Sequence, residues 1–271
     1  MLRSLCLFCA LGCGTALAQE PAAPVDLASL FARTVDNALV VPAEVQGSYA
    51  RQASRLLAAA GLVSLPAQVV VVVDSNPRVQ ALLLFWMAPG ATPQLLGASP
   101  VSTGRPGRFD YFETPLGVFD HSIANLDFRA EGTKNENGIK GYGEKGLRVF
   151  DFGWQLSPKG WGDRRPSTMR LQMHATDPTY LEPRLGSVQS KGCVRIPATL
   201  NKFIDHYGLL DADYEQAMRQ GARFWVLDPQ RQPTPWSGRY LVVLDSGSTQ
   251  RPPWSAPGNG AFHADSATAC R

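Results

Sequence analysis

The sequence is short of charged residues. They make up 18% of its 271 residues, against roughly 25% in an average soluble domain. The formal net charge is only +3 and shows no basic stripe, which excludes a dedicated nucleic-acid-binding protein. Beyond the N-terminus no apolar run is long enough to span a bilayer, which excludes a multi-spanning membrane protein. The 25 Gly and 21 Pro favour a loop-rich β protein over a helical bundle.

Residues 1–18 are typical of a secretory signal peptide. Arg3 precedes a mostly apolar stretch, and Ala16-Leu17-Ala18 is a small-x-small cleavage site. The alternative, a short membrane anchor, fits less well because the apolar stretch is short and contains Gly12 and Gly14. We therefore predict an exported protein of the periplasm or cell envelope.

Cleavage after Ala18 leaves two cysteines, Cys193 and Cys270. An exported protein meets an oxidising compartment, where two cysteines can form a disulfide. We predict instead that Cys193 stays a free thiol. Cys270 lies in a tail, residues 246–271, whose Ser, Gly and Pro content predicts disorder and little surface to bury.

Hydrophobic periodicity divides the mature chain into regions. Helical spacing in Asp26–Val40 and Gly47–Leu62 predicts a small N-terminal helical appendage over residues 19–66. Residues 67–245 are predicted to form a mainly β, largely antiparallel domain with a helical stretch between 196 and 221. The strands are expected near Gln68–Val73, Val79–Met87, Gln94–Ser102, Gly117–His121, Arg148–Gln155, Thr168–His174, Arg223–Leu227 and Tyr240–Leu244.

His174 is a candidate proton shuttle. In Met169–Met173 every second residue is apolar, so His174 falls on the opposite, polar face at the end of a strand. This position argues against a packed core histidine. An imidazole with an ordinary pKa near 6.5 can exchange protons at neutral pH.

Cys193 is a candidate nucleophile. It follows Gly192, which permits a tight turn whose backbone N–H groups can stabilise an oxyanion. Lys191 and Arg195 flank it, and their positive potential is expected to favour the thiolate. The alternative is a buried, inert cysteine beside a surface Lys and Arg.

The spacing His174, fifteen residues, Ser190-x-Gly192-Cys193-Val194-Arg195 resembles the signature of the L,D-transpeptidase (YkuD) catalytic domain. Two departures are Lys191, where that family more usually has His, and Ala175, where it usually has Gly. Upstream segments are also similar to the family's, in the same order: the hairpin Val69–Asp74 with Val79–Met87, then Pro100–Gly104 and Thr114–Phe119.

The resemblance implies a β-sandwich catalytic domain over residues 67–245 that acts on peptidoglycan stem peptides. It implies that Cys193 attacks a diaminopimelate carbonyl, with His174 as the base and N–H groups at Gly192 and Cys193 as the oxyanion donors. Ser190 is expected to orient His174 through its hydroxyl or carbonyl. Substrate binding is assigned to Arg195, Lys191 and Thr176.

The same resemblance suggests an amine of a second stem, or of an outer-membrane lipoprotein, as the acceptor. No metal or organic cofactor is expected, because His121, His174, His206 and His263 show no zinc-ligand spacing with the cysteines. We expect a monomer and no nucleic-acid partner.

Two other functions stay open. The first is a hydrolase of the same fold, either an L,D-carboxypeptidase or an amidase that detaches lipoproteins, in which water replaces the acceptor amine. The second is a wall-binding or structural envelope protein without turnover. The complete His/Ser/Gly/Cys/Arg set argues against the second, but the motif does not separate the transpeptidase from the hydrolase.

Residues 120–165 are predicted to be an insert in this domain. Their glycines and the polar segment Glu131–Asn137 fit a long loop, while their aromatic side chains imply packing. The insert directly precedes the strand that carries His174. We predict a lid over Cys193 that excludes water from the thioester, with an ordinary peripheral hairpin as the alternative.

Overall fold

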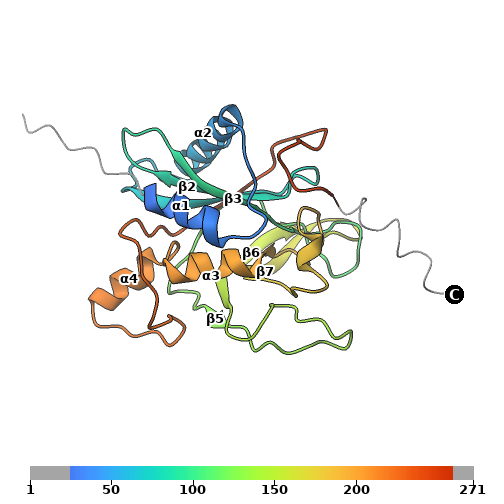
Figure 1. The fold of residues 1–271 in the computed structure, drawn as a ribbon. Helices are drawn as coiled ribbons and strands as arrows, with labels where there is room; N and C mark the ends of the chain where they lie inside the picture. The colour runs from blue at the N-terminus through green and yellow to red at the C-terminus, as the bar shows by residue number, and fades with distance from the viewer. Residues whose placement is uncertain (1–24, 259–271) are drawn as a thin grey trace, which may run out of the picture.

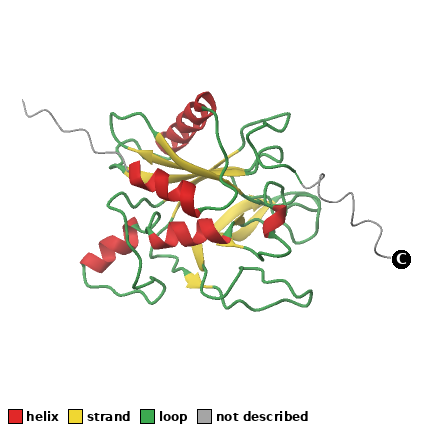
Figure 2. Ribbon diagram, in the orientation of Figure 1, coloured by secondary structure: helices red, strands yellow, loops and turns green. Residues whose placement is uncertain are grey.

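The computed structural model describes residues 25–258. The predicted signal peptide, Cys270 and the end of the tail lie outside the described residues. The expectation of a sheet-rich chain with few helices is confirmed, and the strands form two sheets (Figures 1 and 2).

The first sheet has the strand order β3-β2-β1-β9-β4. Its centre is the valine run of β1, which pairs antiparallel with β2 and parallel with β9. Such a run is typical of a strand that is covered on both faces. The bounds are Gln68–Asp74 (β1), Ala81–Met87 (β2), Gln94–Pro100 (β3), Gly117–Asp120 (β4) and Tyr240–Leu244 (β9).

The second sheet has the order β5-β6-β7-β8. The long hairpin of β6 and β7 is its body, and the short β8 pairs parallel with the end of β7. The sequence did not predict β5 and β8. Their bounds, with those of the hairpin, are Phe128–Arg129 (β5), Arg148–Pro158 (β6), Pro166–Ala175 (β7) and Val194–Ile196 (β8).

Both sheets contribute to one hydrophobic core. Val71 and Val73 of β1 belong to the same buried cluster as Phe150 of β6 and Leu171 of β7. The other face of β1 packs in a second cluster with α2. This arrangement leaves the second sheet with one apolar face on the core and one polar face.

Helices α1 (Val25–Thr34) and α2 (Ala43–Ala59) agree with the two predicted helices, although α1 ends earlier than expected. Both helices pack into the hydrophobic core and are not a separate appendage. Phe31 of α1 is 2% exposed and packs edge-on against Phe203 of α3 (Ala198–His206), with 5.4 Å between ring centres. The helical stretch after β8 contains α3 and α4 (Ala212–Arg219), and a short 3-10 helix spans Glu182–Arg184.

Three expectations need correction. The apolar run Arg223–Leu227 is not a strand: it follows α4, and Phe224 packs on Tyr214 instead of pairing with a sheet. Disorder from residue 246 onward does not hold for residues 246–258, because Trp254 packs edge-on against Tyr49 of α2. Within the predicted insert 120–165, residues 148–158 are the central strand β6, so only the loop between β5 and β6 is an excursion.

Among residues 25–258, none of the helices combines the length and apolar character needed to cross a membrane.

Candidate active site

The polar face of the second sheet gathers the predicted catalytic residues. On β7 the predicted alternation is confirmed, with Leu171 and Met173 in the core. On β8 Val194 and Ile196 are also in the core, so the residues between and before them face the other way. The parallel register sets His174 beside Arg195 and brings Cys193 next to Gln172. His174, Cys193 and Arg195, which lie apart in the sequence, therefore share one face of one sheet.

The turn before β8 fixes the cysteine. Gly192 has a φ of +128°, which residues with a side chain rarely adopt, and a Cβ there would lie 2.6 Å from the Met169 sulfur, so the turn favours glycine. The Ser190 hydroxyl donates to the Cys193 carbonyl (2.6 Å) and accepts from the Gly192 N–H (3.0 Å). These two bonds hold the backbone on both sides of the thiol.

The turn also changes the predicted oxyanion donors. Because the Gly192 N–H is bonded to Ser190, it is not free to stabilise an oxyanion in this conformation. The Cys193 N–H makes no hydrogen bond within the described part of the chain. The Cys193 N–H is thus the donor available beside the thiol.

His174 is 5% exposed and lies under the loop between β5 and β6. Its Nδ1 is 2.6 Å from the Ala175 carbonyl, which assigns the proton to Nδ1 and leaves the lone pair on Nε2. Burial lowers the pKa of His174 to about 4, partly offset by the Ala175 hydrogen bond. His174 is therefore neutral at physiological pH and able to accept a proton.

Cys193 is half-buried, and its thiol lies 3.8 Å from the Arg170 carbonyl. Burial raises the pKa of Cys193 to about 11, although the Gln172 N–H and the Arg195 charge act in the opposite direction. Arg195 therefore favours the thiolate as expected, but desolvation of the thiol outweighs it, and Lys191 does not contribute. The resting pair is an uncharged thiol and an uncharged imidazole.

Arg195 is a partly buried cation with no carboxylate partner among the described residues. Its Nη1 donates to the Gln189 carbonyl at 3.4 Å, and its Nε is buried with no partner among the described residues. Burial lowers the pKa of Arg195. An unsatisfied guanidinium beside a thiol is a ready binding group for an anion, since its planar fork matches a carboxylate.

The other predicted site residues are arranged differently from expectation. Ser190 does not orient His174, because its hydroxyl serves the cysteine turn and its carbonyl accepts from Arg105. Thr176 is fully buried, so it offers no surface to a substrate in this conformation. Lys191 is exposed and forms a surface ion pair with Asp110 at 2.7 Å.

Sequence reasoning missed a hydrogen-bonded support around His174. Tyr142, in the loop between β5 and β6, packs edge-on against His174 with 4.6 Å between ring centres. Its hydroxyl bonds the Gln172 amide oxygen (3.0 Å), and the Gln172 nitrogen donates to buried Asp151 (2.9 Å). An aspartate between Phe150 and Phe152 in an apolar strand was the available signal.

The loop between β5 and β6, at the lower right of Figure 1, is tied down on both sides of His174. Besides Tyr142, the Lys140 N–H donates to Asp177 at 2.9 Å. Gly143 has a φ of +80° and approaches Ala175 and the Thr176 carbonyl so closely that a Cβ would lie 3.1 Å from each. The loop therefore covers His174, while the lid over Cys193 stays a prediction.

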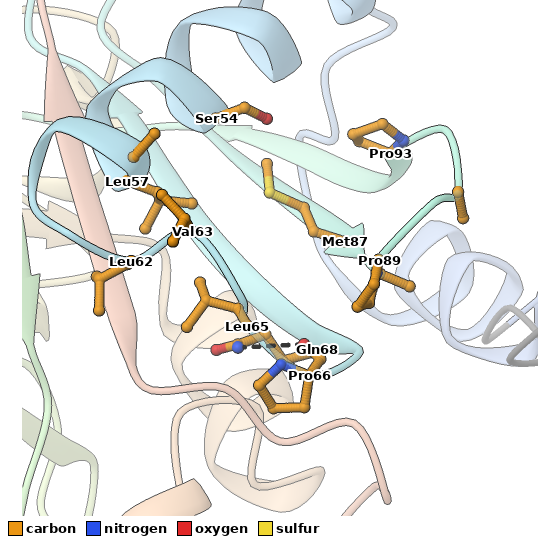
Figure 3. Close-up of a pocket in the computed structure, with 13 residues that line it drawn as sticks. Ser54, Leu57, Leu62, Val63, Leu65, Pro66, Gln68, Met87, Pro89 and Pro93 are labelled. Atoms are coloured by element: carbon orange, nitrogen blue, oxygen red, sulfur yellow. Dashed lines mark hydrogen bonds between the residues drawn. The ribbon is translucent and has the colours of Figure 1, made fainter.

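A separate apolar groove of about 320 Å³ lies between the end of α2 and the end of β2 (Figure 3). Leu57, Leu62, Leu65 and Met87 line it, and none of the predicted site residues does. Within residues 25–258 no group of three or more His, Cys, Asp or Glu side chains is arranged to hold a metal ion.

Comparison with protein-family models gave no match, and neither did comparison with curated proteins. Among solved structures, the chain was aligned with the helical cell shape determining protein Pgp2 (K307A mutant) from Campylobacter jejuni, at 14% identity and a TM-score of 0.24. The alignment covers 80% of this chain and 59% of that one, so the chain spans about three fifths of the length of Pgp2. A likeness at this TM-score supports no inference about fold or activity.

Proposed function

We propose that the chain is an exported cysteine L,D-transpeptidase that acts on peptidoglycan stem peptides, and that its two sheets are the β-sandwich of that family. The observation that carries the proposal is the shared face of β7 and β8. There a thiol, a neutral histidine and an unpaired arginine lie together around one free backbone N–H. A wall-binding protein without turnover has no use for a free thiol, a neutral imidazole, an unpaired guanidinium and a free N–H at one place.

In this mechanism Arg195 binds a carboxylate of the stem peptide, which sets the diaminopimelate carbonyl over Cys193. Because the thiol and imidazole are both uncharged at rest, the proton moves to Nε2 of His174 as sulfur attacks. The Cys193 N–H stabilises the oxyanion. His174 then returns the proton to the departing D-alanine amine, leaving a thioester on Cys193.

The second half-reaction exchanges the thioester for an amide. The amine of a second stem, or of an outer-membrane lipoprotein, attacks the carbonyl and loses its proton to His174. As the C–S bond breaks, His174 passes this proton to the departing sulfur, which restores the Cys193 thiol. The loop between β5 and β6 favours transfer over hydrolysis because Tyr142 covers His174 and limits the access of water. With water as the acceptor, the same site would be a carboxypeptidase.

Product masses test this proposal. The mature protein is incubated with disaccharide tetrapeptides and the products are measured by mass spectrometry. Cross-linked dimers are expected, whereas trimmed tripeptides alone would identify a hydrolase. Unchanged substrate from the folded protein would contradict both enzymatic functions.

A further inference from the structure

A glycine bulge in β6 turns two large apolar side chains out to solvent. In register, Asp151 faces Gln172 but Trp154 faces Arg170, so β6 holds one extra residue at this point. Gly153, in that stretch, has a φ of +76°. Without the bulge Trp154 would follow the inward alternation of Phe150 and Phe152, but instead it is 64% exposed.

The exposed side chains lie on the face that carries the cysteine. Leu156, two residues further along β6, is 71% exposed. The Arg170 guanidinium lies 5.7 Å from the centre of the Trp154 ring, and the carbonyl of the same arginine is 3.8 Å from the Cys193 thiol. We call Trp154, Leu156 and Arg170 the ledge; it continues the candidate active site along the hairpin.

The ledge carries hydrogen-bond donors but no free charge. Arg170 donates from Nε to the buried Asp151 carboxylate at 2.7 Å, so the two charges compensate each other. Its terminal Nη groups make no hydrogen bond within the described chain, and the side chain is 39% exposed. Arg195, by contrast, is the unpaired cation for a substrate carboxylate.

An uncharged surface of aromatic ring, aliphatic side chain and planar donors fits a pyranose. The C–H groups on one face of a sugar carry partial positive charge and are attracted to the face of an indole. Sugar hydroxyl and acetamido oxygens accept hydrogen bonds from a guanidinium. An acidic peptide would find no net positive charge on the ledge.

We propose that the ledge is a subsite for an N-acetylhexosamine ring of the glycan strand that carries the stem peptide. This inference rests on the proposed function for the identity of the polymer, but the binding itself does not require turnover. The subsite would place the sugar on one side of Cys193 and the stem carboxylate at Arg195.

The binding test uses the full mature chain with Cys193→Ala, titrated with a β-1,4-linked N-acetylglucosamine tetramer and followed by NMR. We expect binding that shifts the Trp154 indole resonance, and Trp154→Ala should weaken it about tenfold. Trp225→Ala is the matched control, because Trp225 is 75% exposed and lies outside the sheets. No binding by the parent, or equal weakening in both variants, would overturn the proposal.

A kinetic test separates this subsite from the proposed function. In the active protein, Trp154→Ala should lower kcat/KM for the disaccharide tetrapeptide and leave that for the free tetrapeptide unchanged. An equal loss with both substrates would assign the ledge to the peptide and contradict the sugar subsite. If neither substrate is turned over, the proposed function is contradicted. The sugar titration still tests the subsite, because binding does not require turnover.

Discussion

Within residues 25–258, two histidine–arginine pairs differ in their surroundings: His121 and Arg148 are fully buried, whereas His174 is buried beside a partly buried Arg195. Arg148 is fully buried and donates to Asp127 (2.7 Å) and to both oxygens of Asp211 (3.0 and 2.7 Å). His121 is held between the Leu210 carbonyl (2.8 Å) and Asp127 (2.9 Å). Every charge in this first pair is matched.

The second pair has no such partners. Among the described residues the His174 ring bonds only the Ala175 carbonyl, and Arg195 has no carboxylate partner. The pKa values of the first pair are raised, and those of the second pair are lowered. Burial alone would lower the pKa of His121, but Asp127 outweighs it and the pKa is raised, as is that of Arg148 beside Asp211 and Asp127. Burial lowers the pKa of both His174 and Arg195.

The two arginines differ in whether carboxylates match their charge. A buried cation that is matched by carboxylates stabilises the fold, because removing it leaves those carboxylates uncompensated. A buried cation left unmatched costs stability and is retained where a ligand supplies the missing partner.

The arginines should differ most. Arg148→Met leaves Asp127 and Asp211 buried without their cation and should lower the free energy of unfolding by about 3–5 kcal/mol. Arg195→Met removes an unpaired charge and should leave stability unchanged or raised while activity on stem peptides falls. Urea unfolding of both variants measures the difference. A similar loss of stability in the two would contradict the contrast.

The histidines should show opposite pH dependence. His174 has a folded pKa near 4 against an unfolded value near 6.5, so it contributes stability that is lost as pH falls through this window, by about 3 kcal/mol. The pKa of His121 is raised, so its contribution is present at low pH and lost as pH rises through the folded pKa.

Unfolding free energies of wild type, His174→Gln and His121→Gln across a pH series test this. The advantage of wild type over His174→Gln should grow from pH 4 to pH 6.5, whereas its advantage over His121→Gln should shrink as pH increases. If both differences in unfolding free energy changed in the same direction with pH, the two histidines would not have opposite pKa shifts.

A smaller effect is expected at Ser190. Ser190→Ala leaves the buried Gly192 N–H without its acceptor, which should lower the free energy of unfolding by about 1–3 kcal/mol. Acylation of Cys193 should slow, because the turn no longer fixes the thiol. Ser187→Ala is the control, since Ser187 bonds the Arg184 carbonyl (2.8 Å) in the same segment and does not touch the cysteine turn. Equal acylation rates in the two variants would show that the two Ser190 hydrogen bonds do not position the thiol.

The smallest effect is expected at Lys191. Its ion pair with Asp110 is more than half exposed on both sides, so Lys191→Met should change the free energy of unfolding by less than about 1 kcal/mol. Activity on stem peptides should change by less than about twofold, because the side chain points to the surface pair. A large rise in KM would restore Lys191 as a substrate-binding residue.

Local patterns predicted the parts of the fold that are set by neighbouring residues. The valine run of β1 and the alternation in Met169–Met173 fix their strands and place His174 on the polar face. The apolar run Arg223–Leu227 misled because its partner is Tyr214, a tertiary contact that periodicity does not encode. The length of β8 and its parallel pairing with β7 also depend on contacts between distant segments.

The sequence predicted that His174 and Cys193 belong to one site, but not the other contacts of that site or its electrostatics. The motif spacing brought Cys193 and His174 to attention, but the sign of the Cys193 pKa shift depends on how far the fold desolvates the thiol. The role of Ser190 depends on the turn geometry, which sets its hydroxyl against the Cys193 carbonyl. The link from Asp151 through Gln172 to Tyr142 spans three elements, so sequence spacing does not reveal it.

Intact-mass spectrometry after exposure to a carbapenem tests directly whether Cys193 is a nucleophile served by His174. We expect one covalent adduct on the mature protein, no adduct on Cys193→Ala, and slower labelling of a folded His174→Gln variant. An adduct that maps to Cys270, or that persists in Cys193→Ala, would contradict it.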